Sequence, residues 1–406
     1  MDRPSRKWWM LAIVSAGFVA MTTNWFNIAA GFGQISETFQ LDIPQVALLI
    51  SVFVIGYGVF HIPGGVLATR MGMRWVLALG LTVEGAAVIL SATANDFATL
   101  LVFRVLCGVG ASVFAAVGVA AVSVWFRNRH HALALGVTSA CFSVGSAAGL
   151  YTWRDLTDAF GWRTALVAGG ALCVVVGVVT AAAFRVPADG DHLRGIRLTR
   201  AALRESLMNR GIWLYGAAFL GAYGAFITGS QLIAGYGLDQ RHVGAGEVAL
   251  AAFLIGIAGV PGSVAGGWIS DRLSSRRNVF VAAAVTEGVF VLLVPLSGPG
   301  WFWVPAMGVG FMFNFALAVW QTIPGDRPGL SQENIGTAFG LMLTISAVGG
   351  FALPYLFGEL APTAGYPLAW SVLGVLSIGC AFLAMLNGET RRTGRRNPPL
   401  PTASDA

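Results

Sequence analysis

Long apolar segments separated by short polar connections make up most of the sequence. A helix needs about 20 mostly apolar residues to cross a membrane, and twelve segments of about that length follow one another along the chain. We therefore predict an all-α integral membrane protein with twelve transmembrane helices. Their approximate limits are 8–31, 44–69, 74–94, 97–125, 131–153, 162–184, 211–236, 246–270, 278–296, 301–323, 335–358 and 364–387.

The amino-acid composition also indicates a membrane protein. Of the 406 residues, 56% are apolar and 11% are charged, and the mean hydropathy is +0.72, whereas soluble domains contain about 25% charged residues. These values exclude a soluble globular domain and a disordered chain. The net charge of +6 is small for a chain of this length, so we predict no nucleic-acid partner.

The basic residues are concentrated in alternate connections. Cytoplasmic connections of membrane proteins hold an excess of Lys and Arg. Sorting the 25 basic residues leaves only Arg154, Arg163 and Arg241 on the side away from the termini, and Arg104 falls inside a helix. We therefore predict that both termini are cytoplasmic. The abundance of Arg, Ala, Gly and Val is typical of a prokaryotic genome, which makes the plasma membrane the expected location.

One loop pattern occurs twice in the chain. Two glycines and two arginines between the second and third predicted helices recur 202 residues later, and this shift is close to half the chain length. Such a shift predicts two parallel six-helix repeats. The recurring residues are Gly64, Gly65, Arg70 and Arg74, then Gly266, Gly267, Arg272 and Arg276. The predicted division is 1–184 for the N-terminal half, 185–210 for a basic cytoplasmic linker, 211–387 for the C-terminal half and 388–406 for a disordered cytoplasmic tail.

The repeated loop resembles the signature of the major facilitator superfamily of secondary transporters, Gly-x-x-x-Asp-Arg-x-Gly-Arg-Arg/Lys. The second copy has Asp271, Arg272 and Arg276, with Ser274 at a glycine position, and the first copy has Thr69 at the aspartate position. The resemblance implies the family's fold of two pseudo-symmetric halves and transport of a small molecule through the lipid bilayer by alternating access. We expect a monomer.

The resemblance also implies that this loop controls a gate. The family's aspartate pairs with an arginine in the outward-open state, so Asp271 is expected to pair with Arg272 or Arg276. Because the first copy lacks the aspartate, we expect a weaker contact from Arg70 and Arg74. The alternative is that these arginines serve only to orient the protein in the membrane.

Three charged residues lie inside predicted helices: Glu84, Arg104 and Glu287. Each would cost about 2.5–3.5 kcal/mol at the bilayer centre without a partner or a water-filled cavity. Counting residues from the intervening turn puts Glu84 and Arg104 at one depth and predicts an ion pair. Arg104 also matches a second family motif, with Gly108 and Gly110. That resemblance implies the alternative that Arg104 faces the cavity and binds an anion or couples proton movement.

The two acidic residues, Glu84 and Glu287, are 203 residues apart, one residue off the repeat shift. Their equivalence is therefore approximate, because one residue turns a helix by about 100°. Glu287 has no basic residue at matching depth in the neighbouring helices. Two hypotheses stay open for it, a proton-coupling site and a neutral structural carboxyl. Glu84 and Arg104 are the other candidates for coupling to protons.

Polar residues in the helices expected to line the cavity are the substrate candidates. In the superfamily, helices 1, 4, 7 and 10 line this cavity. Amides and phenols there suit a neutral or singly charged small molecule, although each side chain could instead join two helices by a hydrogen bond. The candidates are Asn24, Asn27, Tyr57, Arg104, Tyr151, Tyr223, Gln231, Asn314 and Gln321, with His61 and Ser143 as further polar side chains in helices 2 and 5.

These patterns predict a secondary active transporter of a small metabolite, either a monocarboxylic organic acid or a neutral solute, with proton coupling left open. A passive facilitator and a multidrug exporter are the alternatives. Drug–proton antiporters have Gly-Pro in helix 5, where this chain has no proline between Gly145 and Gly149. Nitrate and monocarboxylate carriers of the superfamily place an arginine in helix 8, or in helices 2 and 8, and neither helix has an internal basic residue here. Nitrate transport is therefore disfavoured.

An enzyme or a sensor is the least supported class of function. The chain has no Gly-x-Ser-x-Gly, no His-Glu-x-x-His and no phosphate-binding Gly-x-x-x-x-Gly-Lys motif. Its four cysteines show no Cys-x-x-Cys spacing, so we predict no metal site and no cofactor.

Overall fold

The computed structural model describes residues 3–126, 131–187, 200–273, 275–326 and 335–387, and these segments form helices and short connections without a strand. Eleven helices are long and apolar enough to cross a membrane, and α3 with α4, bent by 40° at their junction, makes a twelfth span. The prediction of twelve transmembrane helices is thus confirmed. The elements are α1 (Arg3–Phe26), η1 (Asn27–Gly31), α2 (Phe32–Phe39), α3 (Ile43–Val59), α4 (His61–Met71), α5 (Met73–Ser91), α6 (Phe97–Trp125), α7 (His131–Phe160), α8 (Trp162–Ala183), α9 (Arg200–Met208), α10 (Arg210–Gly235), η3 (Tyr236–Gln240), α11 (Ala245–Ile257), α12 (Gly259–Arg272), α13 (Arg276–Leu293), η4 (Val294–Leu296), α14 (Trp303–Trp320), η5 (Ile323–Asp326), α15 (Ile335–Ala364), α16 (Tyr366–Ala381) and η7 (Phe382–Leu386).

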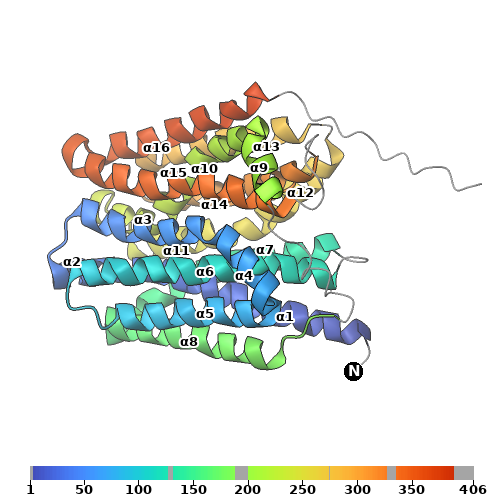
Figure 1. The fold of residues 1–406 in the computed structure, drawn as a ribbon. Helices are drawn as coiled ribbons and strands as arrows, with labels where there is room; N and C mark the ends of the chain where they lie inside the picture. The colour runs from blue at the N-terminus through green and yellow to red at the C-terminus, as the bar shows by residue number, and fades with distance from the viewer. Residues whose placement is uncertain (1–2, 127–130, 188–199, 274, 327–334, 388–406) are drawn as a thin grey trace, which may run out of the picture.

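The helices form two bundles that lie against each other along their length (Figure 1). The elements from α1 to α8 form one bundle, and those from α10 to α16 form the other. The most extensive contacts between the bundles are those of α3 with α15 and of α7 with α11. Gly58 on α3 and Gly256 on α11 allow this contact, because a Cβ on either would lie within 3 Å of an atom of the opposite bundle.

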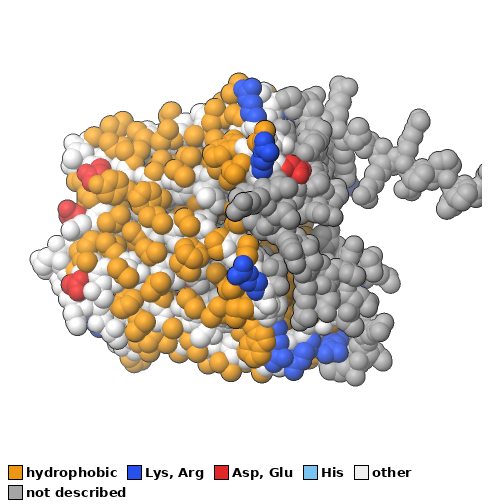
Figure 2. All heavy atoms as spheres, viewed as in Figure 1, with side chains coloured by type: hydrophobic (Ala, Val, Ile, Leu, Met, Phe, Trp, Pro, Cys, Tyr) orange, Lys and Arg blue, Asp and Glu red, His pale blue; other side chains and the backbone are white. Residues whose placement is uncertain are grey.

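The side chains on the outer surface are distributed as a membrane requires. Figure 2 shows apolar side chains covering the face in view, with Lys and Arg toward the end that holds the N-terminus and Asp and Glu mainly at the opposite end. Two arginines toward the basic end lie over tryptophan rings, Arg74 over Trp75 and Arg272 over Trp268. This arrangement agrees with the positive-inside pattern, and the cytoplasmic orientation of the termini stays a prediction.

The number of residues that separates equivalent positions of the two halves is not constant along the chain. Glu84-Gly85 and Glu287-Gly288 occupy equivalent places, because Gly85 packs against Gly170 on α8 and Gly288 packs against Gly374 on α16. The shift is therefore 202 residues at the loop glycines, 203 in the third helix of each half and 204 in the sixth. The connection between α12 and α13 contains the additional residue.

This change of register corrects one pairing inferred from the sequence. Arg74 donates a hydrogen bond to the carbonyl of Ala181, near the end of α8. The residue with the matching contact is Arg277, which donates to the carbonyl of Asn387 after η7 at 2.6 Å. Arg276, the residue that matched Arg74 in the sequence, has different partners. The two halves thus make equivalent contacts through Arg74 and Arg277, whereas counting residues in the sequence had matched Arg74 to Arg276.

The predicted linker contains a short helix in its described part, α9. Residues 188–199 of the linker and the predicted tail at 388–406 lie outside the described residues. The domain limits therefore stay predictions.

Candidate functional site

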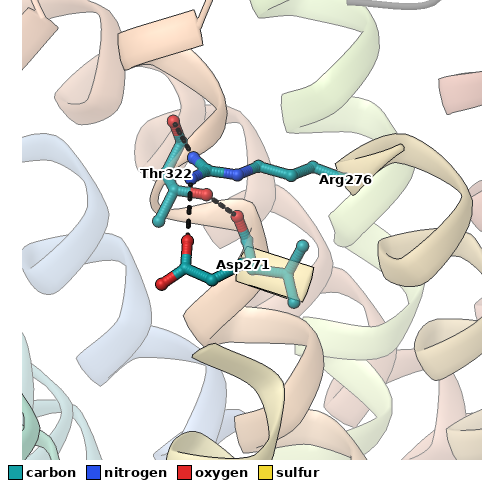
Figure 3. A network of polar contacts seen from close by, with 4 residues as sticks. Asp271, Arg276 and Thr322 are labelled. Carbon is teal, nitrogen blue, oxygen red and sulfur yellow. Dashed lines mark hydrogen bonds and ion pairs between the residues drawn. The ribbon is translucent and has the colours of Figure 1, made fainter. Parts of the chain in front are cut away.

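A polar network lies at the basic end of the C-terminal half, where α12, α13 and the end of α14 meet (Figure 3). Asp271 Oδ1 and Arg276 Nη2 form an ion pair at 3.3 Å, and Arg276 Nη1 donates to the carbonyl of Thr322 at 3.5 Å. The Arg276 side chain is 15% exposed and the Asp271 side chain is 65% exposed. The ion pair and this hydrogen bond therefore join α12 and α13 to the end of α14.

The other predicted gating residues lie outside this network. The Arg272 guanidinium carbon is 3.7 Å from the centroid of the Trp268 ring. In the first half, Arg70 is exposed, and Arg74 contacts α8 and Trp75. The Thr69 side chain lies outside the described part of the structure, so the predicted asymmetry between the two loops stays a prediction.

Arg104 is the buried cation of the structure's N-terminal half, with 1% of its surface exposed. Its Nε donates to the carbonyl of Leu49 at 3.5 Å and its Nη2 to the carbonyl of Trp25 at 3.4 Å. The guanidinium carbon lies 4.8 Å from the centroid of the Phe53 ring. A guanidinium has five N–H donors, and these two hydrogen bonds are longer than the usual 2.7–3.2 Å. Arg104 is therefore buried with weak partners.

The structure describes both Glu84 and Arg104 and shows no direct ion pair between them, although the two charges still interact through space, so the predicted contact is not formed. The backbone of Glu84 lies level with Gly110, since a Cβ on Gly110 would be 2.4 Å from the Glu84 nitrogen. Arg104 is six residues from Gly110, about 9 Å along the helix axis, and its side chain leans further away, toward the N-terminus of α6. Glu84 Oε2 accepts instead from the Cys173 thiol at 3.7 Å, and Oε1 has no partner.

Glu287 occupies the equivalent place in the C-terminal half and is completely buried. Both of its carboxyl oxygens lack a hydrogen-bond partner. Ser377 stands on α16 where Cys173 stands on α8, but its hydroxyl donates to the carbonyl of Ala284 at 3.3 Å. The structure therefore leaves both hypotheses for Glu287 open.

Aromatic rings fill the middle of the molecule between the two halves. The Trp25 ring lies 4.5 Å from Tyr57, and Phe226 stacks on Phe313 at 3.9 Å. Phe26 and Phe226 bring the two halves together, with ring centroids 6.4 Å apart. Tyr57 and Tyr223, both substrate candidates, are buried beside these rings.

The amide candidates differ in how well they are satisfied. Asn24 donates to the carbonyl of Gly169 on α8 at 2.9 Å, and Asn27 donates to Asn24 Oδ1 at 3.1 Å. The first of these bonds joins α1 to α8, as the packing alternative for Asn24 expects, and the second lies within the first membrane span. Asn27 Oδ1 and Gln231 Oε1 remain buried without a partner, so they keep a capacity to accept hydrogen bonds.

Two candidates lie away from the central group. Gln321 is exposed just beyond Trp320, where α14 ends, whereas Asn314 is buried within α14. Tyr151 is 44% exposed and borders a cavity of about 400 Å³ between α7 and α11, together with Gly246, Leu250 and Phe253. The described residues contain no cluster of His, Cys, Asp or Glu suited to a metal ion.

The bend between α3 and α4 involves residues that the sequence did not single out. Thr344 on α15 donates to the carbonyl of Gly58 at 2.8 Å, which is a contact between the halves. Ser112 on α6 donates to the carbonyl of Tyr57 and lies 2.7 Å from His61 Nδ1. The sequence signal near this bend is Pro63, whose missing N–H leaves the carbonyl of Val59, in the same turn, without its helical donor.

Comparisons with known proteins agree with this architecture. A family model described as the Major Facilitator Superfamily matches residues 13–354. The chain is 27% identical to a probable sulfoacetate transporter, SauU, of Cupriavidus necator, over 89% of this chain and 88% of the relative. It is 24% identical to a hexuronate transporter of Bacillus subtilis, over 92% and 93% of the two chains. A bacterial homologue of the human lysosomal transporter Spinster, solved in an inward-facing, occupied conformation, has the same fold, with a TM-score of 0.70, 17% identity, and coverage of 93% of this chain and 96% of that chain.

Proposed function

The chain belongs to the Major Facilitator Superfamily, and from that premise we propose that it moves a small organic anion with one carboxylate across the plasma membrane. It is a multi-pass membrane transporter and not an enzyme. In the proposed cycle, the two halves rock around a site near the membrane midplane, and the contacts of Asp271 with Arg276 form in one access state and break in the other.

The observation that carries this proposal is the environment of Arg104. A buried cation needs a charged or strongly polar partner, and Arg104 meets two carbonyls at long hydrogen-bond distances, the Phe53 ring and the Cys107 thiol, none of which is charged. A carboxylate matches the planar guanidinium with two parallel hydrogen bonds. The two relatives described above are named for organic anions, sulfoacetate and hexuronate, which supports the same class of substrate.

Coupling to protons is the second part of the proposal. Glu84 lies in the same half as Arg104 and has one carboxyl oxygen without a partner, and Glu287 has two. Both carboxyls lie within membrane spans, where acidic residues commonly act in proton movement. Uptake of the anion together with a proton would use this pair of sites, one in each half.

A neutral solute is the second candidate substrate. Asn27 Oδ1 and Gln231 Oε1 are buried acceptors without partners, and such groups suit the hydroxyls of an uncharged molecule. A hexose with a hydroxymethyl group in place of the hexuronate carboxylate distinguishes the two candidate substrates, because only the neutral-solute proposal expects its transport.

Flux into liposomes containing the purified protein tests the proposal. We expect uptake of galacturonate and sulfoacetate, little uptake of nitrate or galactose, and a loss of uptake when a protonophore collapses an imposed pH gradient. Galactose uptake equal to that of galacturonate would favour the neutral solute. Anion uptake that ignores the protonophore would identify a passive facilitator instead.

A further inference from the structure

The second and eighth membrane spans are both interrupted, and the two interruptions differ in their polar contacts. α3 gives way to α4 at Phe60, and α11 gives way to α12 at Ala258. In each case a proline, Pro63 or Pro261, is the third residue of the second helix. Because proline has no N–H, the carbonyl four residues earlier loses its helical donor. Each break therefore exposes backbone polar groups inside the membrane span.

At the first break, hydroxyl groups donate to carbonyls in the last turn of α3, next to that of Val59. Thr344 donates to the carbonyl of Gly58 from the opposite half, and Ser112 donates to that of Tyr57. These bonds join α3 to α15 and α6. The protein's own side chains thus supply donors at the first break.

At the second break, a hydroxyl from the opposite half has no partner. Ser143 on α7 is completely buried, and its Oγ makes no hydrogen bond. A Cβ on Gly259, the first residue of α12, would lie 2.4 Å from Ser143 Oγ and 2.5 Å from Asn314 Nδ2. Groups from α7, α14 and α12 therefore converge at one point between the halves.

A second buried donor without a partner lies on the way from this point to Arg104. Trp25 is 1% exposed, and its Nε1 makes no hydrogen bond. The Trp25 carbonyl accepts from Arg104, and the Trp25 ring lies 6.1 Å from that of Phe142, the residue before Ser143. Buried polar groups in native proteins are almost always paired. Asn314 Nδ2 already donates to the carbonyl of Gly310 at 3.0 Å, so the unpaired donors in this region are those of Ser143 and Trp25, and they indicate a ligand that supplies the acceptors.

We propose that Ser143, Asn314 and the first turn of α12 bind a second oxygen-bearing group of the substrate, while Arg104 binds its carboxylate. The N-terminus of a helix attracts oxygen atoms that carry negative charge, and the 14-residue α12 begins at this point. The substrate class is then a short carboxylic acid with a hydroxyl or sulfonate at its other end. This inference rests on the proposed transport of an organic anion.

Paired substrates and a pair of matched variants test the subsite. Propionate and 3-hydroxypropionate differ by one hydroxyl, and sulfoacetate carries a sulfonate. Wild-type protein is expected to have a lower KM for 3-hydroxypropionate and sulfoacetate than for propionate. Ser143→Ala should raise the KM for these two about three- to tenfold, the effect of one hydrogen bond, and leave the KM for propionate unchanged. Its melting temperature should stay the same, because the hydroxyl has no partner in the protein.

Ser146→Ala is the control, since Ser146 is a buried serine of the same helix whose hydroxyl bonds to the carbonyl of Phe142 at 3.0 Å. It should leave all three KM values at their wild-type levels. If Ser143→Ala is not produced in folded form, Asn314→Ala should give the same loss of selectivity. Selectivity that is unchanged in a folded Ser143 or Asn314 variant overturns the subsite.

The same assays separate this subsite from the proposed function. If wild-type protein moves none of the three acids, the proposed function is wrong. The effect of Ser143→Ala on whichever solute is moved, such as galactose, then decides the subsite on its own: a raised KM supports it and an unchanged KM overturns it.

Discussion

The two halves of the transporter share a backbone plan but differ in their buried polar groups. In each half, a Glu-Gly pair on the third helix packs against a glycine of the sixth helix, at Gly170 or Gly374. At this shared crossing, Glu84 accepts a hydrogen bond from the Cys173 thiol, whereas Glu287 has no hydrogen-bond partner. Only the N-terminal half also buries an arginine, Arg104, within the described membrane spans. The glycines are preserved because close helix packing requires them, while the chemistry beside them has diverged.

The halves also begin their fourth helices in different ways. Asp96 caps α6 locally by accepting from the Thr99 nitrogen at 2.8 Å. The corresponding helix α14 has no capping side chain of its own. There, Glu247 of α11 accepts from the nitrogens of Gly300 and Phe302 at 2.8 and 2.9 Å. A contact within one turn in the first half is replaced by a contact between distant segments in the second.

The largest expected effect follows from placing the anion site in the N-terminal half. Arg104→Gln should lower the flux of an organic anion about 100-fold, because losing one member of a buried charged contact costs roughly 2–5 kcal/mol. Glu287→Gln in the other half should leave the substrate KM unchanged and remove only the proton-driven part of this flux. The double variant Arg104→Gln with Glu84→Gln should stay as inactive as the single variant. Recovery of flux in the double variant would show that the two side chains act as an ion pair after all.

The next effect tests the shared helix crossing. A Cβ on Gly85 would lie 2.5 Å from the Gly170 carbonyl oxygen, and one on Gly288 would first meet the flexible side chain of Ile378 at 2.6 Å. Gly85→Ala should therefore destabilise the protein by about 1–3 kcal/mol, and Gly288→Ala by less. Gly267→Ala is the control, since its Cβ would meet nothing within 4 Å. Equal melting temperatures for the Gly85 and Gly288 variants would contradict this difference in tightness.

The polar network at the basic end should affect transport more than stability. Asp271→Asn removes the ion pair with Arg276, which is worth about 1 kcal/mol at an exposed position. Losing it shifts the balance between the access states, so the flux should fall two- to fivefold. Melting temperature and flux are measured together. Wild-type flux in the Asp271→Asn variant would leave these arginines with a role in membrane orientation alone.

The last comparison concerns the two helix starts, which affect stability alone. Glu247→Ala should cost about 1–2 kcal/mol, because two backbone donors lose a charged acceptor, and Asp96→Ala should have a smaller effect. Hydrogen bonds from the Thr99 nitrogen and hydroxyl lower the pKa of Asp96. Ionised Asp96 therefore stabilises the folded protein at pH values above the ordinary carboxyl pKa. This contribution is lost as the pH falls through the lowered pKa of Asp96 in the folded protein. Thermal unfolding of both variants between pH 3 and pH 7 measures the two effects, and a larger loss for Asp96→Ala would reverse the comparison.

Local sequence patterns were sufficient to predict the membrane spans and the family resemblance. Both depend on interactions within one segment: an apolar run long enough to cross the bilayer, an excess of arginine on one side of the membrane, and the glycines and charges of a short loop. The pairing of Asp271 with Arg276 was also within reach, because the two residues are five apart in the chain.

The arrangement of side chains around the centre depended on the tertiary structure. Counting residues placed Glu84 beside Arg104, but the crossing of α5 and α6 sets Glu84 level with Gly110. Thr344 and Gly58 meet although 286 residues separate them, and the convergence of Ser143, Asn314 and Gly259 involves both halves. Such contacts depend on the rotation and tilt of each helix against its neighbours, and a single sequence specifies these only through the packing of the whole molecule.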